Sequence, residues 1–228
     1  MLCILMNKFE IIIIIIIIII GICTYFPKEK FSSLEYADIN DNWIEPQIFE
    51  NFITKEDAEY IINYGEKNFE TSGILSGIDK TIRNSKTTWL SKKDPVAKKI
   101  IKKVCSIVNM SYKNTEDLQI VKYKHGGFYN EHHDSCCDKH NECKEFIKRG
   151  GQRVVTFLIY LSDDFEEGGT FFPTLNKIYK PKKYGGILFY PLATNINMCH
   201  PKALHAGLPI KSGVKYIANI WIREKIFI

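Results

Sequence analysis

Apolar residues recur at the helical spacing of three to four positions in two segments before residue 110. In the first segment, Thr54 and Asp57 have the spacing of a capping box, which predicts that a helix begins there. In the second, Asp94 precedes Pro95, a pair typical of an N-cap and the first helical turn. Residues 72–90, between the two segments, are rich in glycine and serine and predict a loop.

From residue 119 onward the pattern changes to short β-branched and aromatic runs, bounded by Gly, Pro or Asp, which predict strands. The runs read LQIVKYKHGGFY, RVVTFLIYLS, GGILFYP and VKYIANIWI. Helices followed by a series of strands indicate an α+β chain that is mainly β. We expect one domain over residues 46–228, with flanking N-terminal helices packed on a core that is either a β-sandwich or a jelly roll (double-stranded β-helix).

The chain before this domain contains ten consecutive isoleucines, and its charge-free part, residues 11–26, is 16 residues long. A spanning helix typically needs about 20 apolar residues, and no small-residue cleavage site follows. The alternative, a buried strand, would be unusually long and aggregation-prone. We therefore expect an N-terminal membrane anchor over residues 1–26 and a polar linker over residues 27–45.

The lysines that flank the isoleucine run do not fix its orientation. We expect either a lumen-facing, single-pass type II protein of the endoplasmic reticulum or a protein of a viral membrane. The formal net charge of the whole chain is +5, and its lysines are scattered, partly at helical spacing on a solvated face. A nucleic-acid surface is therefore not expected.

Most of the metal-binding residue types gather in the stretch YNEHHDSCCDKHNEC. Alternate residues of a strand point to the same side, so His132 and Asp134 should lie together while His133 faces away. One imidazole and one carboxylate need a second histidine to form the triad of non-haem Fe(II) oxygenases. The candidates are His200 and His205, both in the run HPKALHAGLP.

The cysteines of the same stretch leave three alternatives open. A structural zinc site could use Cys136 or Cys137 with His140 and Cys143. A disulfide could join Cys136 or Cys137 to Cys143, or the thiols could be free. None of these alternatives conflicts with a metal at His132 and Asp134.

Four blocks of the chain stand in the order of a known family. QIVKYKHGGFYNEHHD ends in Y-x-x-H-x-D, and RVVTFLIYLSDDFEEGGTFFP is similar to R-x-x-T-x-L-x-Y-L followed by a Gly-Gly, Thr and F-P turn. KPKKYGGILFYP is similar to K-P-x-x-G, and HAGLPIKSGVKYIANIWI to H-x-G-x-P-V-x-x-G-x-K. From about Phe49 to Arg223 the chain thus resembles the Fe(II)/2-oxoglutarate dioxygenases of the prolyl 4-hydroxylase type, in particular single-domain members of viral or algal type.

The resemblance implies a role for six residues. It makes His132, Asp134 and His205 the iron ligands, and favours His205 over His200 because His205 stands ten residues before a lysine. That lysine, with two neighbouring hydroxyl groups, would bind the 5-carboxylate of 2-oxoglutarate. The three residues of this second group are Lys215, Tyr123 and Thr170.

Four further positions are less clear. Arg153 and Trp221 match positions near the site, but they could equally be an ion-pair partner and a core residue. The family usually has G-G-E-T before its F-P turn, whereas this chain has EEGGT. Glu167 and Gly169 therefore stand where Gly and Glu are usual, which leaves the geometry of this turn open.

The resemblance implies an enzyme that 4-hydroxylates peptidyl proline with Fe(II), O2 and 2-oxoglutarate, releasing succinate and CO2, with L-ascorbate as reductant. Its partner would be a proline-containing peptide or protein, bound in extended form beside the loop at residues 72–90. The alternatives are a 2-oxoglutarate-dependent hydroxylase of lysine, a free amino acid or another small molecule, or a non-catalytic membrane-tethered binding module.

Overall fold

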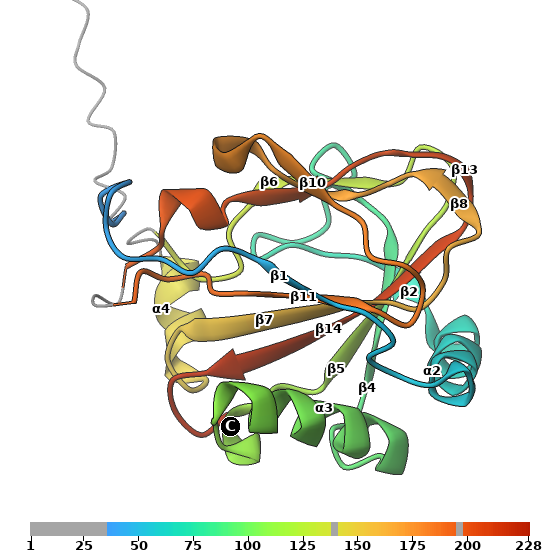
Figure 1. Cartoon of the computed structure of the whole chain (residues 1–228), viewed down its shortest axis with the longest axis horizontal. Helices are drawn as coiled ribbons and strands as arrows, with labels where there is room; N and C mark the ends of the chain where they lie inside the picture. Colours follow the sequence, from blue (N-terminus) through green and yellow to red (C-terminus); the bar gives the residue numbers. More distant parts are fainter. Residues whose placement is uncertain (1–35, 138–140, 195–197) are drawn as a thin grey trace, which may run out of the picture. The chain divides into compact units, whose positions relative to one another are not determined.

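Two antiparallel sheets face each other in the computed structural model, which describes residues 36–137, 141–194 and 198–228 (Figure 1). The larger sheet contains, in spatial order, β1 (Gln47–Phe49), β11 (Gly186–Phe189), β7 (Arg153–Tyr160), β14 (Lys215–Arg223), β5 (Leu118–Tyr123), β4 (Lys86–Leu90) and β2 (Glu70–Thr71). The smaller sheet contains β10 (Lys177–Tyr179), β9 (Thr170–Phe172), β12 (His205–Gly207), β6 (Phe128–His132) and β3 (Arg83–Asn84). Strands β8 (Phe165–Glu167) and β13 (Ile210–Gly213) form a separate pair.

Both predicted helices are present and lie along the larger sheet, as α2 (Lys55–Asn68) and α3 (Pro95–Val108) (Figure 1). Thr54 and Asp57 form the predicted capping box, in which the Thr54 hydroxyl accepts a hydrogen bond from the Asp57 backbone N–H. Asp94 caps α3 by accepting bonds from two N–H groups of its first turn, and Pro95 is the first helical residue. The helix predictions are therefore confirmed at their starts, where local chemistry decides.

The core has two layers because strand side chains alternate between the faces of the larger sheet. In β7, Phe157 and Ile159 belong to the cluster packed with α2 and α3, whereas Leu158 and Tyr160 belong to the cluster between the sheets. A sheet covered by helices on one face and by a second sheet on the other confirms the mainly β, jelly-roll prediction.

The prediction of a loop over residues 72–90 was wrong for its second half. Lys86–Leu90 form β4, which pairs with β5, and Arg83–Asn84 form β3, which pairs with β6. The threonines and tryptophan of β4 favour a strand once β5 offers a partner, and tertiary pairing outweighs the glycine-rich sequence before it. Three 3-10 turns, η1 (Tyr112–Asn114), η2 (Pro173–Leu175) and η3 (Pro201–Ala203), and helix α4 (Asn141–Lys148) were not predicted.

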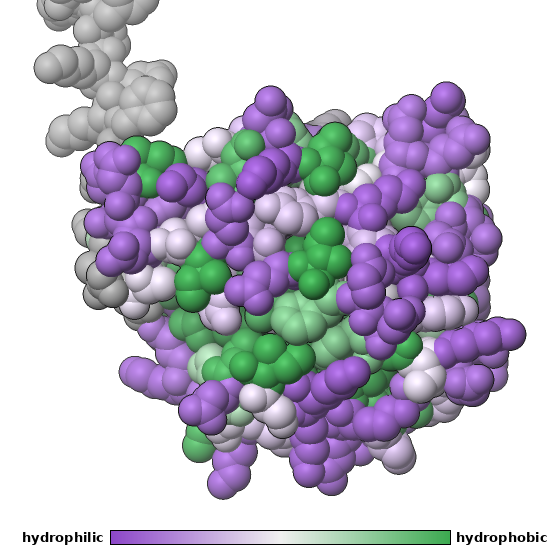
Figure 2. Space-filling model, in the orientation of Figure 1, coloured by the Kyte–Doolittle hydropathy of each residue, from purple (hydrophilic) through white to green (hydrophobic). Residues whose placement is uncertain are grey.

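The predicted membrane anchor over residues 1–26 lies outside the described residues, and none of the described helices is long and apolar enough to cross a membrane. The described part of the predicted linker lies against the domain. Trp43 stacks on His200 with ring centroids 5.2 Å apart, and its indole N–H donates to the Tyr190 carbonyl at 2.7 Å. The next segment is the edge strand β1, whose Ile48 is exposed. Figure 2 shows the molecule from the same side as Figure 1. Hydrophobic side chains gather over the middle of this side, with hydrophilic ones around them.

Candidate active site

His132, Asp134 and His205 converge although 73 positions separate the two histidines. His132 ends β6 and His205 begins β12, and the pairing of these strands sets the two residues opposite each other. Asp134 lies two residues after the end of β6. The Nε2 atoms of His132 and His205 lie 4.0 and 3.8 Å from the two carboxylate oxygens of Asp134. The potential ligand atoms of the three side chains all lie within 4.8 Å of one another, which suits a single metal ion.

Both histidines have a fixed ring orientation. Nδ1 of His132 lies 2.8 Å from the carbonyl oxygen of Asn130, and Nδ1 of His205 lies 3.0 Å from that of Ala203. A carbonyl oxygen can only accept, so each Nδ1 carries the proton and each Nε2 keeps a lone pair directed at the cluster. Burial, and then the neighbouring His205, hold the pKa of His132 well below its ordinary value, which keeps that imidazole neutral.

Asp134 is a buried carboxylate that stays ionised. Burial alone would raise the pKa of Asp134, but the two histidines and Arg153 lower it to about 2. The Thr156 hydroxyl on β7 donates a 2.6 Å hydrogen bond to Oδ2 of Asp134 and lowers that pKa further. The sequence analysis gave Thr156 no role, although it is the Thr of the R-x-x-T block.

Lys215 lies at the first position of β14, opposite Tyr123 in the β5–β14 pairing, and is only 2% exposed. Burial, with Lys180 nearby, lowers the pKa of Lys215 to about 7. Its Nζ donates to the Gly168 carbonyl at 2.6 Å and lies 4.8 Å from the centre of the Tyr160 ring. Among the described residues no carboxylate forms an ion pair with it. A buried ammonium group without a counter-charge is unfavourable until an anion reaches it.

Tyr123 and Thr170 lie near this lysine, as the sequence analysis expected. Nζ of Lys215 is 5.4 Å from the centre of the Tyr123 ring, and burial raises the pKa of the Tyr123 hydroxyl. Thr170 begins β9, is buried, and its hydroxyl lies 2.9 Å from that of Tyr160. Tyr160 is thus a further polar group in this region that the sequence analysis did not single out.

The altered turn EEGGT keeps Thr170 in place. Glu167 and Gly168 both have left-handed backbones, with φ of 60° and 65°. A Cβ at Gly168 would lie 2.2 Å from Cδ1 of Ile210, so this contact and the left-handed backbone both favour glycine there. Glu167 itself occupies a conformation that glycine adopts more readily, and the turn presents the Gly168 carbonyl to Lys215.

One cavity of about 280 Å³ joins the two groups of residues. Its lining includes the histidine–aspartate cluster at one end and Lys215, Tyr123 and Thr170 at the other. Leu75 and Trp89, which also line it, are exposed apolar side chains from the segment predicted to flank a substrate groove. The cavity can therefore hold a small anion between a metal ion and the lysine.

Arg153 and Trp221 line the cavity, but each has a structural partner. Nε and Nη2 of Arg153 donate to the two carboxylate oxygens of Glu116 at 2.7 and 2.8 Å, and the guanidinium lies 3.5 Å from the centre of the Trp221 ring. Arg223 donates to Glu116 as well, at 2.8 Å. Two arginines and one carboxylate therefore form a buried network, and Trp221 is a buried side chain packed on it.

Arg83 is a buried arginine that lines the same cavity. Its side chain donates to Ser85 and to the Gly73 carbonyl, and its guanidinium lies 4.6 Å from the centre of the Tyr129 ring. The sequence analysis gave Arg83 no role, and the signal that could have found it is the Arg-x-Ser spacing in IRNSK.

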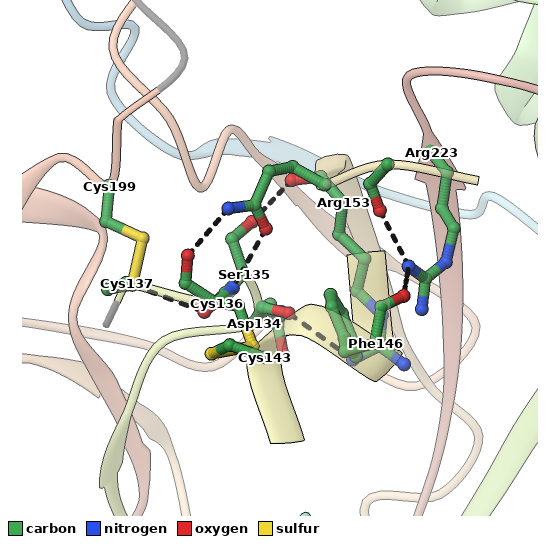
Figure 3. The surroundings of a disulfide bond; sticks show 11 residues. Asp134, Ser135, Cys136, Cys137, Cys143, Phe146, Arg153, Cys199 and Arg223 are labelled. Atoms are coloured by element: carbon green, nitrogen blue, oxygen red, sulfur yellow. Dashed lines mark hydrogen bonds between the residues drawn. A yellow bond between two sulfur atoms is a disulfide. The ribbon is translucent and has the colours of Figure 1, made fainter. Parts of the chain in front are cut away.

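The cysteines form two disulfides, Cys136–Cys143 and Cys137–Cys199 (Figure 3). The first is one of the pairings considered from the sequence, and the second was missed. With these sulfurs bonded to one another, the zinc site is not present, and its proposed ligand His140 lies outside the described residues. The backbone of Cys136 is held on both sides by Gln152, whose amide accepts from its N–H at 3.0 Å and donates to its carbonyl at 2.6 Å.

His200 and His133 are not members of the cluster formed by His132, Asp134 and His205. His200 is buried against Trp43, and its Nδ1 accepts from the Lys202 backbone N–H. His133 groups with Cys137 and Cys199 instead.

The arrangement of His132, Asp134 and His205 beside an open cavity matches the 2-His-1-carboxylate pattern of non-haem Fe(II) oxygenases. The family model described as the 2OG-Fe(II) oxygenase superfamily matches residues 118–223, and a putative prolyl 4-hydroxylase of Acanthamoeba polyphaga mimivirus is 48% identical over 88% of this chain and 81% of its own length. The chain belongs to the prolyl 4-hydroxylase family of the 2OG-Fe(II) oxygenases. It is a 2-oxoglutarate-dependent dioxygenase with Fe(II) and 2-oxoglutarate as cofactors and ascorbate as the family's typical reductant.

Other proteins similar to this chain are also prolyl hydroxylases by name. Prolyl 4-hydroxylase 2 of Arabidopsis thaliana is 30% identical over 79% of this chain and 67% of its own length. The solved structure of viral collagen prolyl hydroxylase from Paramecium bursaria Chlorella virus-1, in complex with 2OG, is similar with a TM-score of 0.60 and 34% identity, over 78% of this chain and 94% of that one.

Proposed function

We propose that this chain hydroxylates proline residues of peptides or proteins at C4, with Fe(II) held by His132, Asp134 and His205. 2-Oxoglutarate would lie in the cavity with its 5-carboxylate at Lys215. The observation that carries the proposal is the pairing of these features at the two ends of one cavity. A metal-ligand cluster alone occurs in many proteins, but a buried lysine in the same cavity, with no described carboxylate paired to it, calls for an anionic ligand.

The donor set fits Fe(II). Two neutral imidazole nitrogens and one ionised carboxylate are the ligands of the facial triad, and they leave positions open for a co-substrate and O2. When bound, iron and 2-oxoglutarate supply the oxidative chemistry, in which decarboxylation to succinate and CO2 accompanies hydroxylation of the substrate.

Backbone and side-chain groups of the protein orient the site before any ligand binds. The carbonyl oxygens of Asn130 and Ala203 hold the two imidazole rings, and the Thr156 hydroxyl holds the carboxylate. Lys215 is buried among aromatic rings and would donate to the 5-carboxylate of 2-oxoglutarate. Water is excluded there, which strengthens the attraction between the two charges. Tyr123 and Thr170 add hydroxyl groups beside it.

The substrate class rests on the relatives, whose printed names are prolyl 4-hydroxylase and viral collagen prolyl hydroxylase. The cavity mouth supports it, because Leu75 and Trp89 offer exposed apolar and aromatic surface there. Extended, proline-rich chains bind to such surfaces with little loss of conformational entropy.

The test uses the purified full chain with Fe(II), 2-oxoglutarate, ascorbate and a panel of proline-rich peptides. We expect peptide-stimulated succinate release and a mass gain of one oxygen on proline, and neither with matched peptides in which alanine replaces proline. Succinate release that no peptide of the panel stimulates would argue against peptidyl proline as the substrate. Stimulation by lysine or a free amino acid would select the alternative hydroxylases.

We further propose that residues 1–26 anchor the protein in a membrane and that the domain faces an oxidising compartment. Two disulfides support this placement, because disulfides persist in the secretory lumen or on virion surfaces and are rare in the cytosol. Protease treatment of sealed microsomes that contain the full chain should leave the domain intact until detergent is added. Digestion without detergent would place the domain on the cytosolic side.

A further inference from the structure

His133, Cys137 and Cys199 form a second cluster of metal-binding side chains beside the iron-binding residues. One ring nitrogen of His133 and the two sulfur atoms all lie within 4.8 Å of one another. The two cysteines come from segments far apart in the sequence, and Figure 3 shows their sulfurs joined in a disulfide. The proposed oxygenase activity uses none of these three side chains.

The imidazole of His133 has a buried ring nitrogen that is free to bind a metal ion. Its Nδ1 atom is buried and has no hydrogen-bond partner within the described part of the chain. The ring packs on Tyr36, with centroids 5.2 Å apart, and this contact fixes its position beside the sulfurs. A buried ring nitrogen that lacks a partner is unfavourable, and a metal ion bound to its lone pair would remove this cost.

The two cysteines can serve either as a disulfide or as a ligand pair. Their Cα atoms are 5.6 Å apart, so only side-chain rotation is needed to separate the sulfurs. Cys199 is buried, and its backbone carbonyl accepts from the Ala37 N–H at 3.0 Å. Cys137 is partly exposed, which gives a reductant access to the bond.

We propose that His133, Cys137 and Cys199 form a redox-gated site for a thiophilic divalent cation such as Zn2+: a disulfide under oxidising conditions, and a metal site with one nitrogen and two thiolate ligands under reducing ones. Two thiolates and an imidazole suit Zn2+, with water in the fourth position. In both states a cross-link joins the same two segments. Each of these segments also carries a proposed iron ligand. Asp134 lies three residues before Cys137, and His205 lies six residues after Cys199.

The chemistry balances with a dithiol as reductant. Two electrons and two protons pass from the dithiol to the Cys137–Cys199 bond, which becomes two thiols, while the reductant closes to its own disulfide. Zn2+ then replaces the two thiol protons, which go to solvent. A disulfide as oxidant reverses the sequence: it takes two electrons from the two thiolates, becomes a dithiol with two protons from solvent, and the ion is released as the Cys137–Cys199 bond forms.

The test uses Co2+ as a coloured substitute for Zn2+, on the full chain before and after reduction with a dithiol that is then removed without air. Thiolate ligands give Co2+ an intense sulfur-to-metal charge-transfer band in the near ultraviolet, and the iron-binding residues cannot, because they contain no sulfur. We expect this band from the reduced chain, with one thiolate-bound cobalt per chain, and none from the oxidised chain. Added Zn2+ should abolish it.

Variants identify the ligands. Cys199→Ser should lose the band. His133→Ala, which keeps both cysteines and their disulfide, should weaken cobalt binding by roughly a hundredfold or more, beyond what loss of a group that only orients a ligand typically costs. The double variant Cys136→Ser/Cys143→Ser, which removes the other disulfide, is the matched control and should keep the band.

Two results would overturn the proposal. The first is a reduced chain that shows no thiolate band at all. The second is a band of unchanged strength in His133→Ala, which would assign the cobalt to other thiols. Neither result depends on turnover, so the outcome is separate from that of the hydroxylase test.

Discussion

The two ends of the cavity differ in how complete they are before a ligand binds. At the metal end, each imidazole and the Asp134 carboxylate already has a hydrogen-bond partner, and Arg153 supplies a positive charge near the carboxylate. At the other end, Lys215 is buried with a single carbonyl contact and no described carboxylate in an ion pair with it. The protein has therefore fixed the geometry of one end and left the charge of the other unbalanced.

This difference indicates which property each end contributes. Geometry matters most where a metal ion must find three ligands at once, so the rings are held by rigid backbone carbonyls. Charge matters most where a diffusible anion must be selected, and a desolvated cation gains most from the pairing. Substitutions at the two ends should therefore change different measured quantities.

The largest effect is expected from His205→Ala, which would remove one of the three proposed metal ligands. Iron-dependent succinate release should fall to background, because two side chains hold the ion too weakly. His200→Ala is the matched control, since this nearby histidine is buried against Trp43 and lies outside the cluster, and it should keep most of the activity. Loss of activity in His200→Ala alone would reverse the ligand assignment.

Lys215→Ala should act on the co-substrate and leave iron binding unchanged. Removing one partner of a buried charge pair costs about 2–5 kcal/mol, which is roughly a 30- to 5,000-fold rise in the KM for 2-oxoglutarate. The control is Lys211→Ala, an exposed lysine on β13, which should leave that KM unchanged. An equal loss of iron affinity in Lys215→Ala would show that the two ends are not separate.

Thr156→Val tests the support of the metal end. It keeps the shape of the side chain but removes the hydroxyl that holds Asp134, so iron affinity should fall by roughly 10- to 100-fold, as is typical when a ligand loses its hydrogen-bond partner. The KM for 2-oxoglutarate at saturating iron should change little. Thr156→Ser, which restores the hydroxyl, should recover the affinity, and failure to recover would assign the effect to packing.

The smallest effect is a pH dependence of 2-oxoglutarate binding. Burial lowers the pKa of Lys215 to about 7, and only its protonated form pairs with the carboxylate. Affinity should be constant below this pH and fall about tenfold per unit above it, because binding must then take up a proton. Calorimetry with Mn2+ in place of iron measures this. In Lys215→Arg, whose guanidinium stays charged, the fall above pH 7 should be absent.

The sequence predicted the metal-ligand cluster better than the residues that support it. His132, Asp134, His205 and Lys215 stand in short motifs whose order and spacing are visible in one chain. Thr156 stands in such a motif too, but a hydroxyl in a buried strand has many possible partners. Its role depends on the pairing of β7 with its neighbours, which brings it to Asp134.

The cysteines and two elements show where local sequence is insufficient. The partner of Cys137 lies 62 residues away, and disulfide connectivity cannot be deduced from sequence alone. Helix α4 has only eight residues, and the sequence analysis predicted no helix there. β4 follows a glycine-rich segment and becomes a strand through its pairing with β5. Each of these depends on a contact between distant parts of the chain.

The Cys137–Cys199 bond also limits how far the chain can be extended by a pulling force. It closes a covalent ring that contains β7 to β11, while β5, β6, β12 and β14 lie outside it. If an oxidised molecule is pulled from its termini, the strands outside can extend but the ring cannot. The 62 residue steps within it correspond to roughly 210 Å of extended chain, which becomes available to the pulling force only after reduction.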